Sequence, residues 1–496
     1  MSGRDMRMMP IAGAAGLVDQ VFDTPPERLQ AAFEAQGAKA LALRSSTAAQ
    51  RVARIKALRE ALLAQREALY GAFAQDMRKS QAEVEATELI PVLDEMRHVI
   101  GDLKAWMKPK RVWPTVTTLG LKARIHYQPR GRVLIISPWN YPLNLCLGPL
   151  VCAIGAGNTA ILKPSEMTPA VSKLVGKIIA AVFDPTEVTL FEGAQATSQA
   201  LLALPFDHIF FTGSPAVGKL VMAAAAKHLT SVTLELGGKS PSIVDESADV
   251  AMAAENLMWG KFINSGQTCI APDHVYVHAG VKAAFVQACL KALDKLYGQA
   301  NERAGNRDLT RIVNARHTQR LKRILDDATS RGARVLVGGQ VDETSNFVAP
   351  TLLEGVEFDS RILQEEIFGP LLPILEFTDL DAVVRQINAG PKPLALYVYS
   401  RDSARTERVL RHTSSGGACV NHCVIHYAHG NLPFGGVNNS GIGNCHGYFG
   451  FKAFSHERSV LTGGAIRSEK FFAPPFTPRR LAFIRRIANM LRWPSF

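Results

Sequence analysis

The first part of the chain has the apolar spacing of helices. Between about Pro25 and Met107, residues such as Val52, Ile55 and Leu58 recur at helical intervals among Arg, Lys and Gln, as on the buried face of an amphipathic helix. We therefore expect this segment to form helices that pack on the surface of the fold.

At Arg132 the pattern changes to short apolar runs that alternate with helical segments. Buried strands that alternate with helices form a parallel sheet with crossover connections. A second α/β region is expected from Gly237 to about Ser415, and the Thr- and Val-rich segment Trp113–Gln128 is expected to form a hairpin. The predicted strands are Val133–Ile136, Ala160–Leu162, Val188–Phe191, Ile209–Phe211, Val232–Leu236, Val335–Val337, Leu372–Phe377 and Leu394–Tyr399.

The composition is that of a large globular protein. The chain has 496 residues, of which 47% are hydrophobic and 20% charged, enough for two or three domains. Its seven cysteines are scattered without a CxxC pair, which favours free thiols in a reducing compartment. No apolar run is long enough to span a bilayer, and Pro10 makes "MMPIAGAAGLV" a poor signal peptide. We expect a cytoplasmic protein.

The net charge of +12 is unevenly distributed. The last 33 residues contain seven Lys or Arg and one Glu, so half of the excess lies in this tail. The rest of the chain has an ordinary charge balance and shows no RNA-binding signature or basic zipper. We expect no nucleic-acid partner.

The segment "FFTGSPAVGKL" resembles a phosphate-binding P-loop. Gly213 and Gly218 lie five positions apart and Lys219 follows, but Leu220 occupies the place of the Mg²⁺-binding Ser or Thr. The segment follows a predicted strand, and Ser214 is suited to cap the helix after it. Exposed N–H groups at such a helix start favour an anion such as a pyrophosphate. Lys219 falls inside the helix and is expected to face solvent.

A second glycine motif, "GAGNTA" at 155–160, has the spelling of a dinucleotide-binding fingerprint. The motif precedes a predicted strand, whereas the fingerprint follows one. We interpret its glycines as the end of a helix and a tight turn.

Three residues are candidates for chemistry. Cys269 lies in "NSGQTCIAP" and is either a small buried hydrophobe or a nucleophilic thiolate. Glu235 interrupts an apolar strand, and a buried carboxylate there is either ion-paired or a general base. Asn140, at the end of a predicted strand, is either a turn residue or the amide of an oxyanion hole.

Taken together, several motifs resemble those of the aldehyde dehydrogenases. The resemblance is greatest to the class 3 and fatty-aldehyde branch, including bacterial enzymes of the coniferyl-aldehyde type, and it covers about residues 45–461. The motifs, in chain order, are "SPWNYP", "LKPSE", "FDHIFFTGSPAVGK", "VTLELGGKSP", "GQTCIAPD", "QEEIFGPLLPI", "KPLALYVYS" and "LPFGGVNNSGIGNCHG".

The resemblance implies a role for each candidate. Cys269 corresponds to the nucleophile, Glu235 to the general base and Asn140 to the oxyanion-hole amide. The expected cofactor is NAD, with NADP as an alternative. The residues implied to contact it are Lys163 and Glu166 at the adenosine ribose, Gly213, Ser214, Val217 and Gly218 at the pyrophosphate, and Glu366 and Phe368 at the nicotinamide riboside. The implied substrate tunnel is lined by Tyr141, Trp259, Thr268, Ile425 and His426.

The implied reaction oxidises a hydrophobic aldehyde, aromatic or medium- to long-chain aliphatic, to its carboxylic acid. The Cys269 thiolate attacks the aldehyde carbon, a hydride leaves to NAD(P)⁺, and water activated by Glu235 hydrolyses the thioester. The residue types suit these steps, because a thioester is labile enough to be hydrolysed.

The resemblance also implies an α/β fold with two doubly wound parallel-sheet domains and a small β bridging or oligomerisation element. Since an unpaired strand edge is prone to aggregate, that element implies a homodimer. The implied ranges are 1–111 and 130–236 for the NAD(P)-binding domain, 237–416 for the catalytic domain, 112–129 and 417–461 for the bridging region, and 462–496 for a basic tail.

Three other functions were weighed. An acylating dehydrogenase would pass the thioester to coenzyme A or phosphate, which Glu235 disfavours. A catalytically inactive scaffold is disfavoured because all three candidate residues are retained. A metal-binding module is disfavoured because its spacing is not that of a recognised zinc site, and we expect no metal. Its candidate ligands are Cys419, His422, Cys423, His426, His429, Cys445 and His446.

The tail is expected to form a basic amphipathic helix that starts at Thr477 and Pro478. Such a helix suits the surface of an anionic membrane, as a peripheral contact through residues 471–496. Docking on a partner subunit or over the tunnel mouth is equally consistent with its apolar face. That face consists of Leu481, Ile484, Ile487, Ala488 and Leu491, the basic residues are Arg479, Arg480, Arg485, Arg486 and Arg492, and the flanking aromatics are Trp493 and Phe471, Phe472, Phe476, Phe483 and Phe496.

Overall fold

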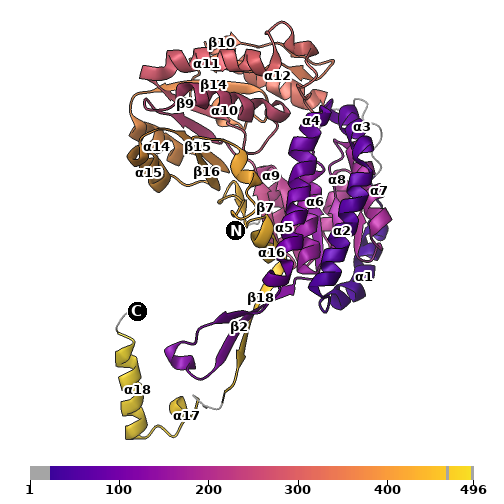
Figure 1. Ribbon diagram of the computed structural model, residues 1–496, viewed down its shortest axis with the longest axis vertical. Helices are drawn as coiled ribbons and strands as arrows, with labels where there is room; N and C mark the ends of the chain where they lie inside the picture. The colour runs from indigo at the N-terminus through magenta and orange to yellow at the C-terminus, as the bar shows by residue number, and fades with distance from the viewer. Residues whose placement is uncertain (1–22, 465–468, 493–496) are drawn as a thin grey trace, which may run out of the picture.

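The computed structural model describes residues 23–464 and 469–492. The signal-like segment "MMPIAGAAGLV" lies outside the described residues, as do Trp493 and Phe496, and the side chain of Phe471 is likewise not described. In Figure 1 the chain forms two lobes, from one of which a β-ribbon extends toward the C-terminal helices.

The first lobe is built on a six-stranded sheet. Its strand order is β17-β7-β6-β3-β4-β5, and the neighbours are parallel except for β17, which pairs antiparallel with β7. The strands are β3 (Arg132–Ile136), β4 (Thr159–Lys163), β5 (Val188–Leu190), β6 (His208–Gly213), β7 (Ser231–Leu236) and β17 (Gly441–Ile442).

Helices cover both faces of this sheet, as the predicted alternation of strands and helices requires. Alternate residues of a strand point to opposite faces: Val133 and Ile135 pack with α2, α5, α6 and α7, whereas Leu134 and Ile136 pack with α1, α8 and α9. The helices are α1 (Pro26–Leu43), α2 (Ala48–Ala64), α3 (Arg66–Met77), α4 (Gln81–Val84), a π-helical turn (Glu85–Leu89), α5 (Ile90–Trp106), α6 (Asn144–Ala156), α7 (Pro169–Val182), α8 (Gln195–Leu202) and α9 (Pro215–Ala226).

The second lobe is built on a seven-stranded sheet of order β10-β13-β14-β9-β8-β15-β16. Only the β10–β13 pair is antiparallel among its described neighbours. The strands are β8 (Pro241–Val244), β9 (His274–His278), β10 (Arg334–Val337), β13 (Thr351–Glu354), β14 (Leu371–Phe377), β15 (Ala395–Tyr399) and β16 (Gly417–Val420), with a small separate pair β11 (Val341–Asp342) and β12 (Phe347–Val348).

This second sheet is also covered on both faces. One core contains residues of α10 and α11, and the other contains residues of α12, α14 and α15. The structure thus confirms the predicted α/β class with two doubly wound, largely parallel sheets. The helices are α10 (Val250–Phe262), α11 (Ala279–Tyr297), α12 (Ala315–Ser330), α13 (Arg361–Gln364), α14 (Leu380–Ala389) and α15 (Ser403–His412), with 3₁₀ turns at Ile263–Gly266, Arg303–Gly305 and Ile425–Ala428.

The glycines of "GAGNTA" end a helix, as predicted. Helix α6 ends at Ala156, and Gly157 follows in the left-handed conformation with φ +91°. A Cβ on Gly157 would lie 2.4 Å from the Arg51 guanidinium carbon. Arg51 donates to the carbonyl of Gly155, so glycine is needed both for the turn and for the approach of this side chain.

The predicted hairpin is present, but its strands are displaced from the prediction. The first strand, β1 (Lys110–Val112), ends before Trp113, and the second, β2 (Lys122–Pro129), pairs with it antiparallel. Pro114 has no N–H to donate to a ladder, so the chain leaves the sheet there and forms a 3₁₀ turn at Val116–Thr118. A third strand, β18 (Ser455–Thr462), pairs with β2 over its full length. It follows α16 (Gly447–Ala453).

Two helices follow the ribbon: α17 (Glu469–Phe472) and α18 (Pro478–Met490). The predicted start of α18 is confirmed, because the Thr477 hydroxyl accepts a hydrogen bond from the Arg480 N–H at 3.4 Å. The predicted apolar face is not packed against the lobes. Its side chains are exposed or partly exposed, and Figure 1 shows α18 away from both lobes. Within 23–464 and 469–492, no helix has the length and apolarity to cross a bilayer.

Candidate active site

The β6–α9 turn presents a helix start at the carboxyl edge of the first sheet. Ser214 caps the helix by accepting a hydrogen bond from the Val217 N–H at 3.4 Å. A Cβ on Gly218 would lie 2.7 Å from Leu236, so the missing side chain lets α9 pack closely on β7. Lys219 faces solvent, as predicted. The turn can therefore offer free N–H groups to an anion.

Lys163 and Glu166 form an ion pair at the same edge. Lys163 is the last residue of β4 and is buried, and its Nζ lies 3.0 Å from Glu166 Oε2. Because β3 and β4 are neighbours, this pair lies beside the strand that leads to Asn140. The predicted ribose-binding residues are thus together, next to the β6–α9 turn across β3.

The loop before Cys269 is locally strained. Asn264, Ser265 and Gly266 all have positive φ, at 52°, 51° and 72°, and a Cβ on Gly266 would lie 2.3 Å from the Gly369 carbonyl oxygen. Non-glycine residues in this region cost free energy and need support from their surroundings. Hydrogen bonds from Gln267 supply that support.

Gln267 is fully buried and satisfies backbone groups on both sides. Its amide nitrogen donates to the carbonyls of Asn264 (3.0 Å) and Arg311 (3.1 Å), and its amide oxygen accepts from the Val313 N–H at 3.0 Å. The loop carrying Cys269 is thereby fixed to the segment before α12.

Asn140 is tied to the same loop. Its side-chain nitrogen donates to the Gln267 carbonyl at 3.0 Å, and Asn264 Nδ2 donates to the Asn140 carbonyl at 2.9 Å. Asn140 comes from the end of β3 in the first lobe, whereas Cys269 belongs to the second lobe. An amide nitrogen has two N–H donors, so Asn140 keeps one that is not used by Gln267.

Glu235 lies in β7, opposite Thr212 and Gly441 in the ladders of its two neighbours. Its side chain is buried, and neither carboxyl oxygen has a hydrogen-bond partner among the described residues. Burial raises the pKa of Glu235 well above its usual value. The salt bridge that would have explained this acid structurally is absent from the described residues.

Cys269 and Glu235 influence each other electrostatically. Burial raises the pKa of the Cys269 thiol to about 12, and the nearby carboxyl groups of Glu366 and Glu235 act in the same direction. The thiol therefore needs a base to become nucleophilic at neutral pH. Glu235 in its carboxylate form has the chemistry of such a base, and its raised pKa gives that carboxylate a high affinity for the proton.

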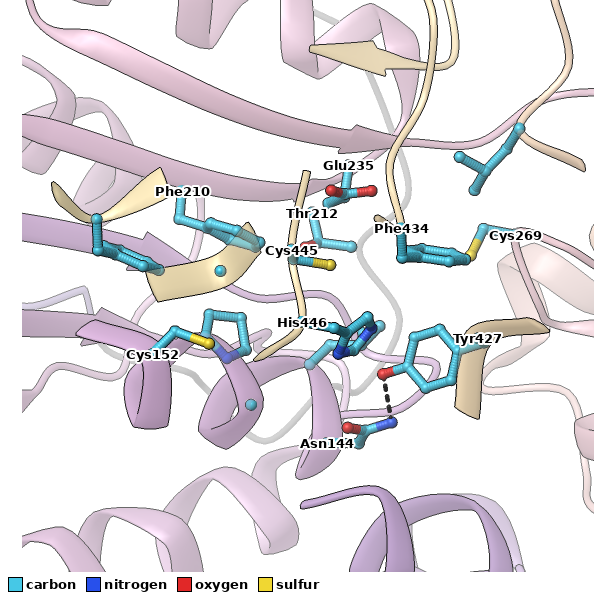
Figure 2. A pocket seen from close by; sticks show the side chains of 16 residues that line it. Asn144, Cys152, Phe210, Thr212, Glu235, Cys269, Tyr427, Phe434, Cys445 and His446 are labelled. Atoms are coloured by element: carbon cyan, nitrogen blue, oxygen red, sulfur yellow. Dashed lines mark hydrogen bonds between the residues drawn. The ribbon is translucent and has the colours of Figure 1, made fainter. Parts of the chain in front are cut away.

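Two cavities meet at Cys269 and Glu235. One is on the side of the β6–α9 turn and is also lined by Trp139, Asn140, Gly213, Ser214, His317, Arg320, Glu366 and Phe368. The second lies between α6 and the sheet, as Figure 2 shows. Its lining is largely apolar and includes Asn144, Cys152, Phe210, Tyr427, Phe434, Cys445 and His446.

The Glu366 carboxyl group lies against a glycine of the opposite lobe. A Cβ on Gly237 would lie 2.3 Å from Glu366 Oε2, and burial raises the pKa of Glu366 to about 7. Asp273, four residues after Cys269, accepts from the Ile367 N–H at 3.0 Å and pairs with Lys239 Nζ at 2.5 Å. Glu366 is thus held at a fixed position relative to Cys269.

Phe368, Trp139 and His317 line the cavity on the side of the β6–α9 turn with their rings. Phe368 has positive φ, 47°, and its ring meets that of Trp139 edge to face with centroids 5.4 Å apart. The His317 ring lies 5.0 Å from Trp139. The sequence analysis did not single out Trp139, His317 or Arg320, although Trp139 stands next to Asn140 in the chain.

The predicted tunnel residues do not all lie together. The Tyr141 hydroxyl is 2.6 Å from Thr268 Oγ1, so these two flank Cys269. The linings of the two cavities at Cys269 include none of the five predicted residues, Tyr141, Trp259, Thr268, Ile425 and His426. The side chain of His426 makes a local contact instead, because its Nδ1 lies 3.3 Å from Cys419 Sγ. Tyr427, the next residue, occupies the cavity wall instead.

The cysteines and histidines of the metal-binding alternative make separate contacts. Cys423 Sγ donates to the Asn256 carbonyl at 3.1 Å, Cys419 contacts His426, and His446 faces Glu95. In the parts of the chain that the structure describes, no three His, Cys, Asp or Glu side chains gather as a metal site. All seven cysteines are free.

The fold and this site together define an α/β protein in which a cysteine, a buried carboxyl group and the start of a helix lie at two adjoining cavities. The comparisons with known proteins agree. A model of the aldehyde dehydrogenase family matches residues 14–460, and the chain belongs to that family. The family oxidises aldehydes with NAD or NADP, and we therefore describe this protein as an aldehyde dehydrogenase.

The relatives support the class 3-like branch. Aldehyde dehydrogenase family 3 member B1 of Homo sapiens is 42% identical over 469 residues, which are 94% of this chain and 97% of that protein. The 4,4'-diaponeurosporen-aldehyde dehydrogenase of Staphylococcus aureus is 42% identical over 422 residues, 85% and 91% of the two chains. A structure of the substrate-bound state of Staphylococcus aureus AldH superimposes with a TM-score of 0.88 at 39% identity, covering 92% of this chain and 99% of that one.

The N-terminal helices contribute more to the site than the sequence analysis predicted. Glu83 of α4 accepts from the Asn264 N–H and from the Thr310 hydroxyl, both at 2.5 Å. Lys79 and Glu88 form a fully buried ion pair at 3.0 Å, with Lys79 Nζ 4.5 Å from the centre of the Tyr141 ring. Amid so many charged helical residues, these three side chains gave no signal of burial.

The contribution of the buried Lys79–Glu88 ion pair to stability near Tyr141 can be tested by substitution. Lys79→Met leaves a buried carboxyl group without its cation, so stability should fall by about 3–5 kcal/mol. Because burial raises the pKa of Glu88, its lone carboxyl favours the protonated form, and the loss should grow as the pH rises above the ordinary carboxyl pKa. The thermal unfolding midpoint, followed between acidic and neutral pH, measures both effects.

The matched control for that test is the double variant Lys79→Met, Glu88→Gln. Glutamine can still accept the hydrogen bond that Glu88 Oε2 accepts from the Asn144 N–H at 3.0 Å. The double variant should therefore recover most of the stability and lose the pH dependence. An equal loss in both variants would show that the packing of the Lys79 stem, rather than charge, is what matters.

Proposed function

We propose that this aldehyde dehydrogenase uses Cys269 as nucleophile, Glu235 as general base and Asn140 in the oxyanion hole to oxidise a hydrophobic aldehyde. The observation that carries the proposal is that Cys269 and Glu235 together line both cavities. One cavity is lined by four of the cofactor-binding residues that the family resemblance implies, Gly213, Ser214, Glu366 and Phe368, and the other has an apolar wall suited to a hydrocarbon.

In the proposed reaction the Cys269 sulfur bonds to the aldehyde carbon, and the carbonyl oxygen becomes an oxyanion. The free N–H of Asn140 and the Cys269 backbone N–H stabilise that charge. Bound NAD(P)⁺ supplies the hydride acceptor. Glu235 then takes a proton from water, the hydroxide adds to the thioester carbon, and the C–S bond breaks to release the carboxylic acid.

The proposed cofactor contacts fit the shape of the first cavity. The start of α9 at Ser214 receives the pyrophosphate, Lys163 and Glu166 face the adenosine ribose, and Glu366 and Phe368 lie where the nicotinamide riboside is proposed. The orphaned Glu366 Oε1 offers an acceptor for a ribose hydroxyl. A carboxylate at Glu166 repels a 2′-phosphate, so we propose NAD as the preferred cofactor.

A hydrophobic substrate is favoured by the second cavity and by the relatives. Phe210, Phe434 and Tyr427 line this cavity with few polar atoms exposed to it. The Staphylococcus aureus relative is named for 4,4'-diaponeurosporen-aldehyde. We propose that this enzyme acts on aromatic or medium- to long-chain aliphatic aldehydes.

The two halves of the reaction should separate in a Glu235→Gln variant. Deacylation needs a base for water, whereas acylation can proceed from thiolate already formed, so a pre-steady-state burst of NADH should survive. The steady-state rate should fall by about 10²–10⁴, the usual contribution of a general base. Stopped-flow absorbance measures both phases.

Cys269→Ala is the control for that experiment and should abolish the burst and the turnover. If Glu235→Gln loses the burst as well, the main role of Glu235 is to activate Cys269. No NADH from the unmodified enzyme with any aromatic or long-chain aldehyde at neutral to alkaline pH would contradict the proposed function itself.

The β-ribbon supports the proposal of a homodimer. Trp113, Val116 and Leu119 at its tip are exposed, Trp113 by 84%, and Leu461 on β18 is exposed as well. A ribbon with an exposed apolar tip and an unpaired edge is suited to pair with a second chain. We propose that 112–129 and 417–461 form the dimer contact.

Light scattering at micromolar concentration should give twice the mass of one chain, 53.9 kDa. Trp113→Glu should weaken the dimer, because it places a charge in an apolar contact. Its control is Leu229→Glu, since Leu229 is also exposed, by 94%, but lies outside the ribbon. A monomeric mass for the unmodified chain would exclude the proposed dimer.

The exposed helix α18 supports a peripheral membrane contact as part of the proposed function. Its four arginines, with Arg492 just beyond its end, and its unpacked apolar side chains are suited to an anionic bilayer surface, where hydrophobic aldehydes also concentrate. A chain ending at Gly463 should keep its activity on small soluble aldehydes. It should lose the salt-sensitive binding to phosphatidylserine vesicles that the full chain shows in a sedimentation assay. If the full chain ignores such vesicles at low salt, α18 instead docks on protein.

A further inference from the structure

A carboxylate and an imidazole form a dyad behind Glu235. Glu95, on α5, lies with Oε2 3.4 Å from Nδ1 of His446, a residue 351 positions later in the chain. The proposed roles of Cys269, Glu235 and Asn140 leave this pair unused. Both side chains are largely buried, and His446 lines the second cavity together with Glu235.

Glu95 is arranged to remain an anion. Its Oε1 accepts from the Gly447 N–H at 2.9 Å and from the Cys152 thiol at 3.1 Å. Burial raises the pKa of Glu95, but the hydrogen bond and charge of His446, together with these two donors, outweigh burial and leave the pKa lowered. A carboxylate acceptor selects the tautomer of His446 that carries its proton on Nδ1.

That tautomer leaves Nε2 of His446 as a lone-pair acceptor. Nε2 is buried and has no hydrogen-bond partner among the described residues, as is true of both carboxyl oxygens of Glu235. Cys445 precedes His446 in the chain and also lies near Glu235. After burial, the charge of Glu235 is the largest cause of the raised pKa of the Cys445 thiol. In Figure 2 the Cys445 side chain lies between those of Glu235 and His446.

The cavity has room for water between these groups. It holds about 30 Å³ of space open to the centres of water-sized spheres, and one water needs about 10–15 Å³ on that measure. Buried polar atoms without protein partners are as a rule satisfied by ordered water. Water in this cavity therefore has acceptors at both ends, Glu235 on one side and His446 Nε2 on the other.

The proposed reaction releases protons that must leave this site. One aldehyde, one NAD(P)⁺ and one water give a carboxylate, NAD(P)H and two protons: the Cys269 thiol and the attacking water each lose one, and the acid proton of the product restores the thiol. Two electrons leave with the hydride. Glu235 can hold one proton at a time, so it has to be emptied before it can act again.

We propose that His446, positioned by Glu95, takes the proton of Glu235 through water in the second cavity and passes it toward solvent. This proposal rests on the proposed function. The Glu235 O–H bond breaks as an N–H bond forms on His446 Nε2, and the resulting imidazolium is stabilised by the Glu95 carboxylate. His446 acts through Glu235, as the proton acceptor, without contact to the reacting carbon, and Glu95 is the residue that positions it.

The charged and titratable groups around His446 are consistent with this direction of transfer. From α5 it faces Glu95, from α6 Cys152, from β7 Glu235, from its own segment Cys445, and Tyr427 packs edge to face at 4.6 Å. His98, one turn beyond Glu95, pairs with Asp102 instead. Among these described groups, Glu95 is the acid whose hydrogen bonds favour its anionic form, so it stabilises a proton on His446.

The decisive variant is His446→Gly, because His446 already has φ +71°, where glycine is unstrained. The variant should keep the NADH burst, while its steady-state rate falls roughly tenfold to a hundredfold. This loss is at or below the about 10²–10⁴-fold loss expected when a general acid or base itself is removed. Imidazole in the buffer should restore the rate in proportion to its neutral form, by filling the space left by the ring. The unmodified enzyme should not respond to imidazole.

Two further variants keep the test decisive if His446→Gly folds poorly. His446→Gln retains a hydrogen-bond donor for Glu95 but cannot carry a proton, so it should be slowed like the glycine variant and should not be rescued by imidazole. Glu95→Gln should lower kcat with little change in KM and shift the pH profile.

Several results would overturn the relay. The first is an unchanged steady-state rate in both His446 variants, and the second is loss of the NADH burst. The third is a higher KM at constant kcat, which indicates a contact with the substrate. In each case the unmodified enzyme still turns over, so the proposed function survives. An unmodified enzyme without NADH production on any aldehyde would instead overturn the proposed function, and the relay with it.

Discussion

Hydrogen bonds between the two lobes determine where the chemistry can occur. Asn140 ends a strand of the first sheet, and Cys269 follows a strained turn of the second, yet Asn264 and Gln267 join the two through backbone carbonyls. The left-handed conformations of Asn264 and Ser265 are supported by the hydrogen bonds that the Asn264 and Gln267 amide nitrogens donate. The proposed oxyanion hole therefore depends on the packing of one loop.

Near these hydrogen bonds between the lobes, burial disfavours the charged forms of several side chains. Burial raises the pKa values of Cys269, Glu235 and Glu366 together, so the resting groups avoid the cost of several buried anions side by side. Charge then appears only as the reaction proceeds, where donors such as Asn140 are already in place. The ion pairs Lys79–Glu88 and Lys239–Asp273 hold the surrounding segments without adding net charge.

Much of the fold was predictable from local pattern, because buried strands and crossover helices are periodic. The core residues of β3 divide between two cores just as alternation predicts. Glu235 was recognisable since an acid is anomalous in an apolar strand. The hairpin was misplaced by a few residues because Pro114 interrupts its ladder. His446 was weighed only as a metal ligand. Glu95, Lys79 and Glu88 escaped notice, because their burial arises from contacts between distant segments or from helix packing that spacing does not encode.

The ribbon strand β18 runs directly toward the exposed helix α18. If two chains pair through their ribbons, one particle carries two basic helices. The second helix then meets a surface at a high effective concentration once the first has bound, so the avidity of the pair can exceed the affinity of either helix by orders of magnitude. Surface attachment and subunit association would then be thermodynamically linked, with each favouring the other.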